Sequence, residues 1–127
     1  IYLKNYTFKC YSKVFLDLMG QKQKIFSAAY ILPSGKGEFG FQRKHENLLK
    51  LIELMIKKSL PKKILSCKSL KEVYELFLSY PTIGPFLAYQ YSIDIAYSEL
   101  TDALESDFVV PGPGDIDGIR KCFIDIF

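Results

Sequence analysis

The stretch YPTIGPFLAYQYSIDI, residues 80–95, combines a predicted tight turn with the most hydrophobic predicted helix of the chain. Residues 80–84 are typical of a tight turn in which the glycine lets the chain reverse, and Pro85 suits the first position of a helix. The residues that follow are apolar enough for a buried helix. With another helix predicted to end near Ser79, this is the layout of a helix-hairpin-helix. The turn either joins two helices only, or its outward-facing amides bind an anion such as a DNA phosphate.

The remaining sequence is also mainly helical, so it predicts an all-α protein of about six helices. Apolar side chains recur at helical spacing in four further segments: residues 8–20, 25–31, 46–58 and 69–79. The last of these begins with a capping box made by Ser69 and Glu72, and Pro61 either stops one helix or starts the next. The segment DFVVPGPGD, residues 107–115, is predicted to be non-helical, with a final helix beginning at Asp115 or Ile116.

Composition limits the possible classes of function. The 127 residues are 49% hydrophobic, which predicts a single helical domain spanning residues 1–127. No apolar run reaches a membrane span and no secretory signal is visible, so we expect an intracellular protein without a membrane partner. Three widely spaced cysteines and one histidine predict neither a metal site nor a disulfide framework, and nothing calls for a cofactor. The net charge of +3 permits a polyanionic partner without requiring one. The non-methionine start and the apolar end suggest a piece of a longer protein.

Three blocks carry a resemblance to a known family: FGFQRKHENLLKLIELM, YPTIGPFLAYQYSIDIAYS and ESDFVVPGPGDIDGIRK. Together they resemble the helix-hairpin-helix DNA glycosylase superfamily. The closer resemblance is to the branch with the helical domain of 5-hydroxymethyluracil DNA kinases and the proposed alpha-glutamyl/putrescinyl thymine pyrophosphorylases. The similarity spans about Gly40 to Lys121. It implies a glycosylase-like domain that handles modified thymine bases in DNA, with DNA as the partner. Its oligomeric state is left open.

The resemblance and the local chemistry together suggest residues that contact DNA phosphates. Backbone amides at the hairpin, the glycines of the PGPG segment and nearby basic side chains are the candidates: Ile83, Gly84, Phe86, Arg43, Lys44, Gly112, Gly114, Arg120 and Lys121. The alternatives are a rigid connection at PGPG and solvated charges elsewhere. Some relatives carry a Schiff-base lysine two residues after the hairpin glycine. Phe86 occupies that position here, so a lyase mechanism is not expected.

Asp115, Asp94 and His45 are the candidate catalytic residues, and Gln90 and Tyr89 are candidates for lining a base pocket. Asp115 stands at the predicted helix start, where the superfamily places a carboxylate, although an N-cap role is the alternative. Asp94 lies four residues after Gln90 on the same helix face, so it either reads a base or belongs to a buried polar network. His45 is suited to proton transfer near neutral pH, or is structural.

Three hypotheses follow for the function. The first is an enzyme that acts on a modified thymine, by glycosidic cleavage or by substitution at the 5-position, with Asp94, Asp115 and His45 around one pocket. The second is a non-catalytic DNA-binding module attached to a modifying enzyme. The third is a helical interaction protein with no role in nucleic-acid chemistry. We favour the first hypothesis and leave open whether the domain is itself an enzyme.

Overall fold

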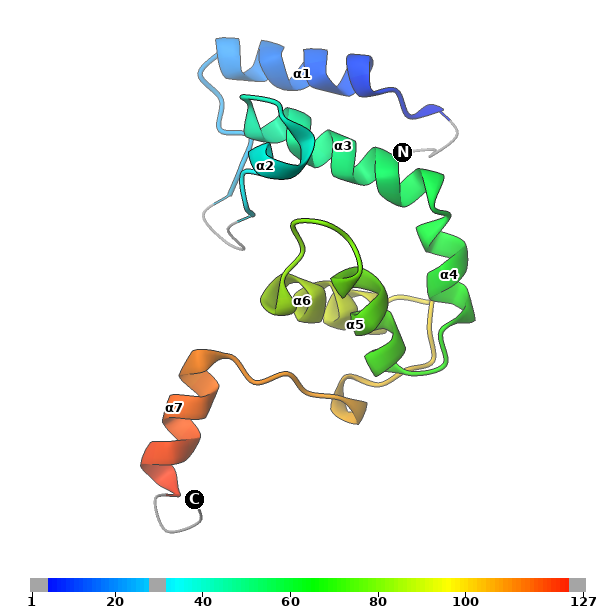
Figure 1. The fold of residues 1–127 in the computed structure, drawn as a ribbon, viewed down its shortest axis with the longest axis vertical. Coiled ribbons are helices and arrows are strands. Elements are labelled where there is room, and N and C mark those ends of the chain that lie inside the picture. Colours follow the sequence, from blue (N-terminus) through cyan, green and yellow to red (C-terminus); the bar gives the residue numbers. More distant parts are fainter. Residues whose placement is uncertain (1–4, 28–31, 124–127) are drawn as a thin grey trace. The chain divides into compact units, whose positions relative to one another are not determined.

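A computed structural model describes residues 5–27 and 32–123, and this part of the chain is all helical, without strands. Seven α-helices and one 3-10 helix follow in order: α1 (Phe8–Gly20), α2 (Lys36–Phe39), α3 (Lys44–Lys57), α4 (Leu60–Ser66), α5 (Leu70–Leu78), α6 (Pro85–Ala96), η2 (Glu105–Asp107) and α7 (Pro113–Cys122). The all-α prediction is therefore confirmed (Figure 1).

The helices form two compact units. Unit 1 contains the described residues up to Ser66 together with the turn Ser79–Thr82, and unit 2 contains Cys67–Leu78 and the described residues from Ile83 onward. Each unit is described by itself below. The prediction of a single domain stays a prediction.

In unit 1, α1 and α3 lie side by side and run in opposite directions (Figure 1). The Tyr6 hydroxyl donates to the backbone carbonyl of Leu49 over 2.6 Å, ahead of α1. Further along the pair, Ser12 Oγ lies 3.4 Å from His45 Nε2. These two polar contacts fix how α1 and α3 are aligned along each other, because each buried polar atom needs a partner.

The glycine-rich segment of unit 1 is held by one buried amide. Asn47, only 1% exposed, accepts a hydrogen bond from the Phe41 N–H over 3.0 Å and donates to the carbonyls of Ser34 and Phe41 over 2.8 and 2.9 Å. Gly35 has φ +68°, and a Cβ there would lie 2.9 Å from the Asn47 Cβ. The close approach of this loop to α3 therefore depends on glycine at position 35. Asn47 is structural.

In unit 2, α5 and α6 pack together as a helical hairpin (Figure 1). Leu70, Val73, Ala88 and Ser92 are all fully buried at 0% exposure. The Ser92 hydroxyl donates to the Ala88 carbonyl over 2.7 Å within the helix, so it enters the apolar interface with its donor satisfied.

The predicted capping box at the start of α5 is confirmed. The Glu72 N–H donates to Ser69 Oγ over 3.2 Å, and Glu72 Oε2 accepts from the Lys68 N–H over 2.7 Å. The return bond thus reaches one residue further back than in the usual box. The orphan amide of Glu72 is satisfied, whereas the Lys68 N–H lies outside the helix, so only the Ser69 half of the box has its usual form.

Three helix predictions need correction. The segment 36–39 forms the short helix α2, although no helix was predicted in this glycine-rich part of the sequence. The final helix begins at Pro113, two residues earlier than predicted, because proline is tolerated in a first turn whose N–H groups lack helical partners anyway. Ile25–Ser27 are not helical, and residues 28–31 of that predicted segment lie outside the described residues.

Candidate functional site

The hairpin turn presents an open helix start. Gly84 is the exposed N-cap of α6, no side chain caps this end, and Pro85 occupies the first turn. Gly84 has φ −87°, whereas Thr82 has φ +66°. The left-handed residue of the turn is therefore Thr82, and the sharp reversal does not depend on the glycine as predicted. Ile83 was also predicted to contact an anion. Its side chain is only 6% exposed and belongs to the core.

A cavity of about 260 Å³ lies in unit 2 between the start of α6 and the PGPG segment. We call it the α6–PGPG cavity. Its lining residues are Pro85, Phe86, Tyr89, Gln90, Val110, Pro111, Gly112, Pro113 and Asp115. Five of these were singled out from the sequence on separate grounds: Phe86, Tyr89, Gln90, Gly112 and Asp115. The structure brings them together around one space.

Asp115 lies in this cavity but is not the N-cap of α7. It is the third helical residue, and its Oδ2 accepts a hydrogen bond from the N–H of Gly112, the N-cap, over 2.8 Å. Asp107 does the same at η2, where its Oδ2 accepts from the Leu104 N–H over 3.0 Å. Each carboxylate therefore stabilises a helix start with one oxygen, which leaves the other Asp115 oxygen for a ligand.

Asp94 does not take part in this cavity. Leu87, Ala88 and Ser92 form the buried face of α6, whereas Asp94 is exposed. The predicted buried polar network is therefore wrong, because solvent hydrates the carboxylate directly. The pKa of the half-buried Tyr91 is raised, first by burial and then by the nearby charge of Asp94.

The remaining predicted phosphate contacts of unit 2 lie on exposed α7. Gly114 and Arg120 are exposed, and Lys121 Nζ pairs with Asp117 Oδ2 at 2.7 Å. This ion pair halves the basic character of the helix end. Phosphate binding by α7 stays a prediction.

His45, the third candidate catalytic residue, belongs to unit 1, whereas both candidate aspartates belong to unit 2. It is 3% exposed, and its ring contacts Phe15 with centroids 5.8 Å apart. Burial lowers its pKa more than the adjacent Glu46 carboxylate raises it, so the imidazole is neutral at pH 7. Asp94 lies outside the cavity that contains Asp115, so the predicted grouping of three residues around one pocket is wrong for Asp94. A shared pocket of His45 and Asp115 stays a prediction.

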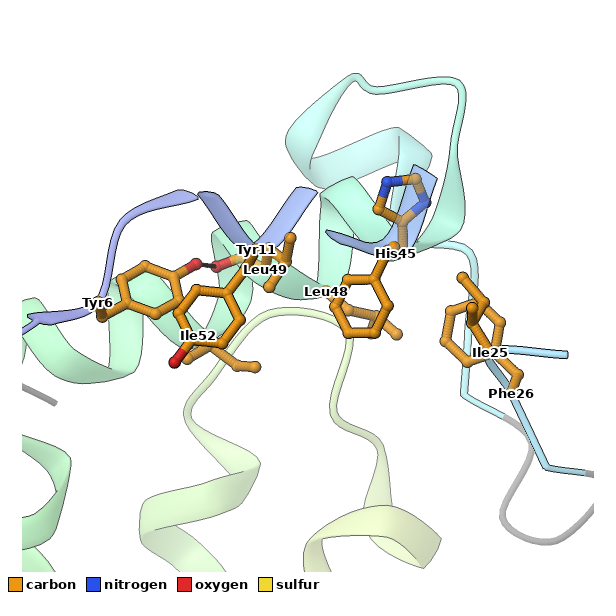
Figure 2. Close-up of a pocket in the computed structure, with 9 residues that line it drawn as sticks. Tyr6, Tyr11, Ile25, Phe26, His45, Leu48, Leu49 and Ile52 are labelled. Atoms are coloured by element: carbon orange, nitrogen blue, oxygen red, sulfur yellow. Dashed lines mark hydrogen bonds between the residues drawn. The ribbon is translucent and has the colours of Figure 1, made fainter. Parts of the chain in front are cut away.

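Around His45, unit 1 contains an aromatic pocket of about 460 Å³ (Figure 2). Its lining residues are Tyr6, Tyr11, Phe15, Ile25, Phe26, His45, Leu48, Leu49 and Ile52. Figure 2 shows Tyr6 and Tyr11 on one side and Ile25 and Phe26 on the other. Lys44, a predicted anion contact, places its Nζ 4.8 Å from the Phe26 ring centroid, and Arg43 is the exposed N-cap of α3.

A second hollow of unit 1, of about 520 Å³, shares Tyr6 with the aromatic pocket. Its lining residues are Tyr6, Thr7, Phe8, Lys9, Lys50, Glu53, Ile56 and Lys57. We call it the lysine groove. None of its three lysines was among the candidates drawn from the sequence.

The distribution of charge along the chain is the feature that would have indicated this groove. Residues 1–66 contain 13 Lys and Arg against 4 Asp and Glu, a net charge of +9, whereas residues 67–127 contain 4 against 10, a net charge of −6. The modest total of +3 conceals this division. A polyanion is therefore attracted to unit 1 and repelled by unit 2.

A family model for the helical domain of 5-hmdU DNA kinases matches residues 1–126. The chain belongs to this family. The match covers nearly the whole chain, whereas the resemblance in the sequence blocks began only at Gly40. No curated protein and no solved structure gives a significant match. The wider relation to helix-hairpin-helix DNA glycosylases stays a prediction.

The described part of the chain shows neither a metal-binding cluster nor a membrane-spanning helix. Residues 5–27 and 32–123 contain no group of three or more acidic, histidine or cysteine side chains placed to hold a metal ion. No helix in these ranges is both long and apolar enough to cross a bilayer.

Proposed function

We propose that this 5-hmdU DNA kinase helical domain binds DNA and holds a thymine-derived base, such as 5-hydroxymethyluracil, in the α6–PGPG cavity. The observation that carries the proposal is the convergence of Phe86, Tyr89, Gln90 and Asp115 on that cavity. The family supports DNA bearing 5-hydroxymethyluracil as the ligand.

The cavity has the chemistry that a single pyrimidine needs. At about 260 Å³ it is slightly smaller than the roughly 300–1,000 Å³ of pockets for drug-sized ligands. Tyr89 and Phe86 supply rings for stacking, and the Gln90 amide offers both a donor and an acceptor to the Watson–Crick edge. The second Asp115 oxygen is an acceptor for a 5-hydroxymethyl O–H. This last contact distinguishes 5-hydroxymethyluracil from thymine.

The same cavity contains one carboxylate, and that carboxylate already caps α7. Binding is therefore the function that its geometry supports best. Alteration of the base by the domain itself is the second candidate, favoured by the position of Asp115 in the cavity.

Fluorescence anisotropy with matched oligonucleotides tests the proposal. The full chain is expected to bind DNA with one 5-hydroxymethyluracil more tightly than the thymine control, and Asp115→Asn is expected to remove most of this preference. Asparagine keeps the acceptor for the Gly112 N–H, so α7 should remain capped. Asp94→Asn, on the same unit but outside the cavity, is the matched control and should behave as the parent.

Gln90→Ala should weaken binding of both oligonucleotides, because the amide contacts the edge that the two bases share. Equal binding of modified and unmodified DNA by the parent chain, or an unchanged preference in Asp115→Asn, contradicts the proposal. Mass analysis of nucleosides after incubation tests the second candidate. Conversion of the base by the parent chain and not by Asp115→Asn would assign catalysis to this carboxylate.

A further inference from the structure

We infer that unit 1 binds a single strand of nucleic acid, with phosphates in the lysine groove and one unpaired base in the aromatic pocket. This inference rests on the proposed function for the identity of the ligand as DNA. It places the contacts with the strand in a different unit from the cavity that recognises the modified base.

The lysine groove is positively charged. Lys9, Lys50 and Lys57 face a single carboxylate, Glu53, so the groove has a net charge of +2. Glu53 contacts both Lys50 Nζ and Lys57 Nζ at 3.1 Å, and these hydrogen bonds hold its pKa below the usual value. The carboxylate therefore stays ionised and keeps two ammonium groups side by side. Lys57 remains 70% exposed and available to a phosphate.

The lysine groove and the aromatic pocket share Tyr6 as a lining residue. Tyr6 is fixed by its hydrogen bond to the Leu49 carbonyl and stacks on Tyr11, with ring centroids 5.3 Å apart and an interplanar angle of 21° (Figure 2). In the groove, Lys50 Nζ lies 4.2 Å from the Phe8 ring centroid. Cationic groups and aromatic rings therefore line two hollows that share Tyr6, and this combination is typical of single-strand binding.

Part of the lining of the aromatic pocket is exposed to solvent. Phe26 and Ile52 are 37% and 41% exposed although both are large and apolar. The Tyr6 hydroxyl is already bonded to Leu49, and His45 Nε2 lies beside Ser12 Oγ, so among the polar side chains of the lining the Tyr11 hydroxyl is the main group left for a base edge. A base whose ring face rests on this lining can leave its polar edge in water. We therefore expect stacking without sequence preference.

The pocket also explains why the strand is single. In a duplex, neighbouring base pairs cover both faces of each base, and a side-chain ring reaches a base face only when the base is unstacked. Duplex phosphates would still be attracted to the groove, so duplex binding should persist in weaker form. A preference for the single strand is the specific consequence of the aromatic pocket.

Anisotropy with a labelled oligothymidine and its duplex tests the inference on the full chain. Lys9→Gln with Lys57→Gln is expected to lower single-strand affinity about 25-fold at 0.1 M salt, since each phosphate contact contributes roughly fivefold relative to 1 M. The slope of log affinity against log salt should fall by about 1.4. Lys68→Gln with Lys71→Gln, the matched pair in acidic unit 2, should change affinity less than about twofold on the same grounds.

A second pair of variants tests the base contact. Phe26→Ala should lower single-strand affinity by roughly fivefold or more through lost stacking, and duplex affinity much less. Phe123→Ala removes a phenylalanine of unit 2 that is 52% exposed, and should leave both affinities unchanged. Circular dichroism confirms that each variant retains its helices.

Two results would overturn the inference while leaving the proposed function intact. One is parent-like binding by both unit 1 variants in a chain that still prefers 5-hydroxymethyluracil. The other is a duplex affinity equal to that for the single strand. Conversely, if the unit 1 variants lose binding in a chain with no preference for the modified base, the inference stands and the proposed function fails.

Competition experiments distinguish other sources of the same chemistry. Free thymidine monophosphate should compete only weakly, since it supplies one phosphate and one base. Competition by this nucleotide as strong as by the oligomer would overturn the strand as the ligand. Equally strong competition by vesicles with anionic lipid would replace nucleic acid with a membrane surface.

Discussion

Unit 1 and unit 2 both contain a cavity lined by aromatic rings, but they differ in charge and in free polar groups. The aromatic pocket of unit 1 lies in a half of the chain with net charge +9, and the polar atoms on its lining are largely occupied. The α6–PGPG cavity lies in a half with net charge −6 and presents the Gln90 amide and the Asp115 carboxylate. On the proposals above, unit 1 would supply affinity for any strand, and unit 2 would recognise one base.

This division follows a general feature of nucleic-acid recognition. Contacts with phosphates supply most of the affinity and carry no sequence information, whereas contacts with base edges supply selectivity. The excess of acidic residues in the half of the chain that contains the base cavity lowers non-specific binding to that half, because it repels phosphates. The strand would then be retained only where the cavity receives its base.

The units also differ in what holds them together, and Asn47→Ala is expected to show the largest effect. The substitution removes three hydrogen bonds from a residue that is 1% exposed and leaves the Phe41 N–H and two carbonyls without partners. We expect a loss of about 1–3 kcal/mol in the free energy of unfolding, since the three bonds are part-buried and water can reach some of the groups left behind. Urea denaturation followed by circular dichroism measures this loss.

Leu70→Ala, in the apolar interface of unit 2, is the matched comparison. It should cost a similar amount, about 2–5 kcal/mol, through the cavity left behind. Hydrogen exchange then separates the two. Loss of protection in α2 and α3 is expected for Asn47→Ala, and in α5 and α6 for Leu70→Ala. A loss below about 1 kcal/mol for Asn47→Ala would mean that water or a shifted loop satisfies these groups.

Local rules predicted most helices and could not predict which of their faces are buried. Ser69 with Glu72 and Pro85 act within one turn of their own helix, so capping chemistry places α5 and α6 nearly to the residue. In α6, apolar side chains occur all round the helix, and nothing local shows which face contacts α5. Asp94 was therefore assigned to a buried face, whereas Leu87, Ala88 and Ser92 occupy that face.

Longer-range features account for the other differences. His45 is buried because α1 packs over the start of α3, a contact between residues 33 positions apart. Five of the nine residues that line the α6–PGPG cavity were singled out from the sequence because they belong to two motifs with distinctive composition, but their grouping around one cavity was not predicted. The lysine groove was missed because its lysines are scattered over α1 and α3 and only their sum is unusual. A charge count for each half of the chain reveals the basic half from the sequence, although not which lysines meet in the groove.

The second effect by size is a pH dependence that belongs to unit 1. Burial holds the His45 pKa below its ordinary value of 6.5, while Arg43 also lowers it and Glu46 raises it. The unfolded state therefore takes up the proton first. Stability is complete above pH 6.5 and is lost as the pH falls below that value towards the lowered folded pKa. Urea denaturation between pH 7.5 and 5 should show this loss.

His45→Gln provides the control, because glutamine does not titrate in this range. Its unfolding free energy should be lower at pH 7.5 and should change less between pH 7.5 and 5 than that of the parent. An equal pH dependence in the two proteins would assign the proton uptake to another group and would remove the argument that this imidazole is neutral in the folded state.

The smallest expected effect is that of Glu53→Gln, which should raise single-strand affinity while lowering the free energy of unfolding. Glu53→Gln removes the one acidic side chain among the described residues that line the lysine groove. Single-strand affinity should rise about two- to fivefold at 0.1 M salt, since Lys50 and Lys57 no longer share their charge with a carboxylate. The unfolding free energy should fall by less than about 1 kcal/mol, because both ion pairs are partly exposed. Glu75→Gln, which breaks the Lys71 pair in unit 2, should cost as little stability without raising affinity. If both substitutions raise affinity equally, binding responds to net charge alone, and the strand has no preferred unit.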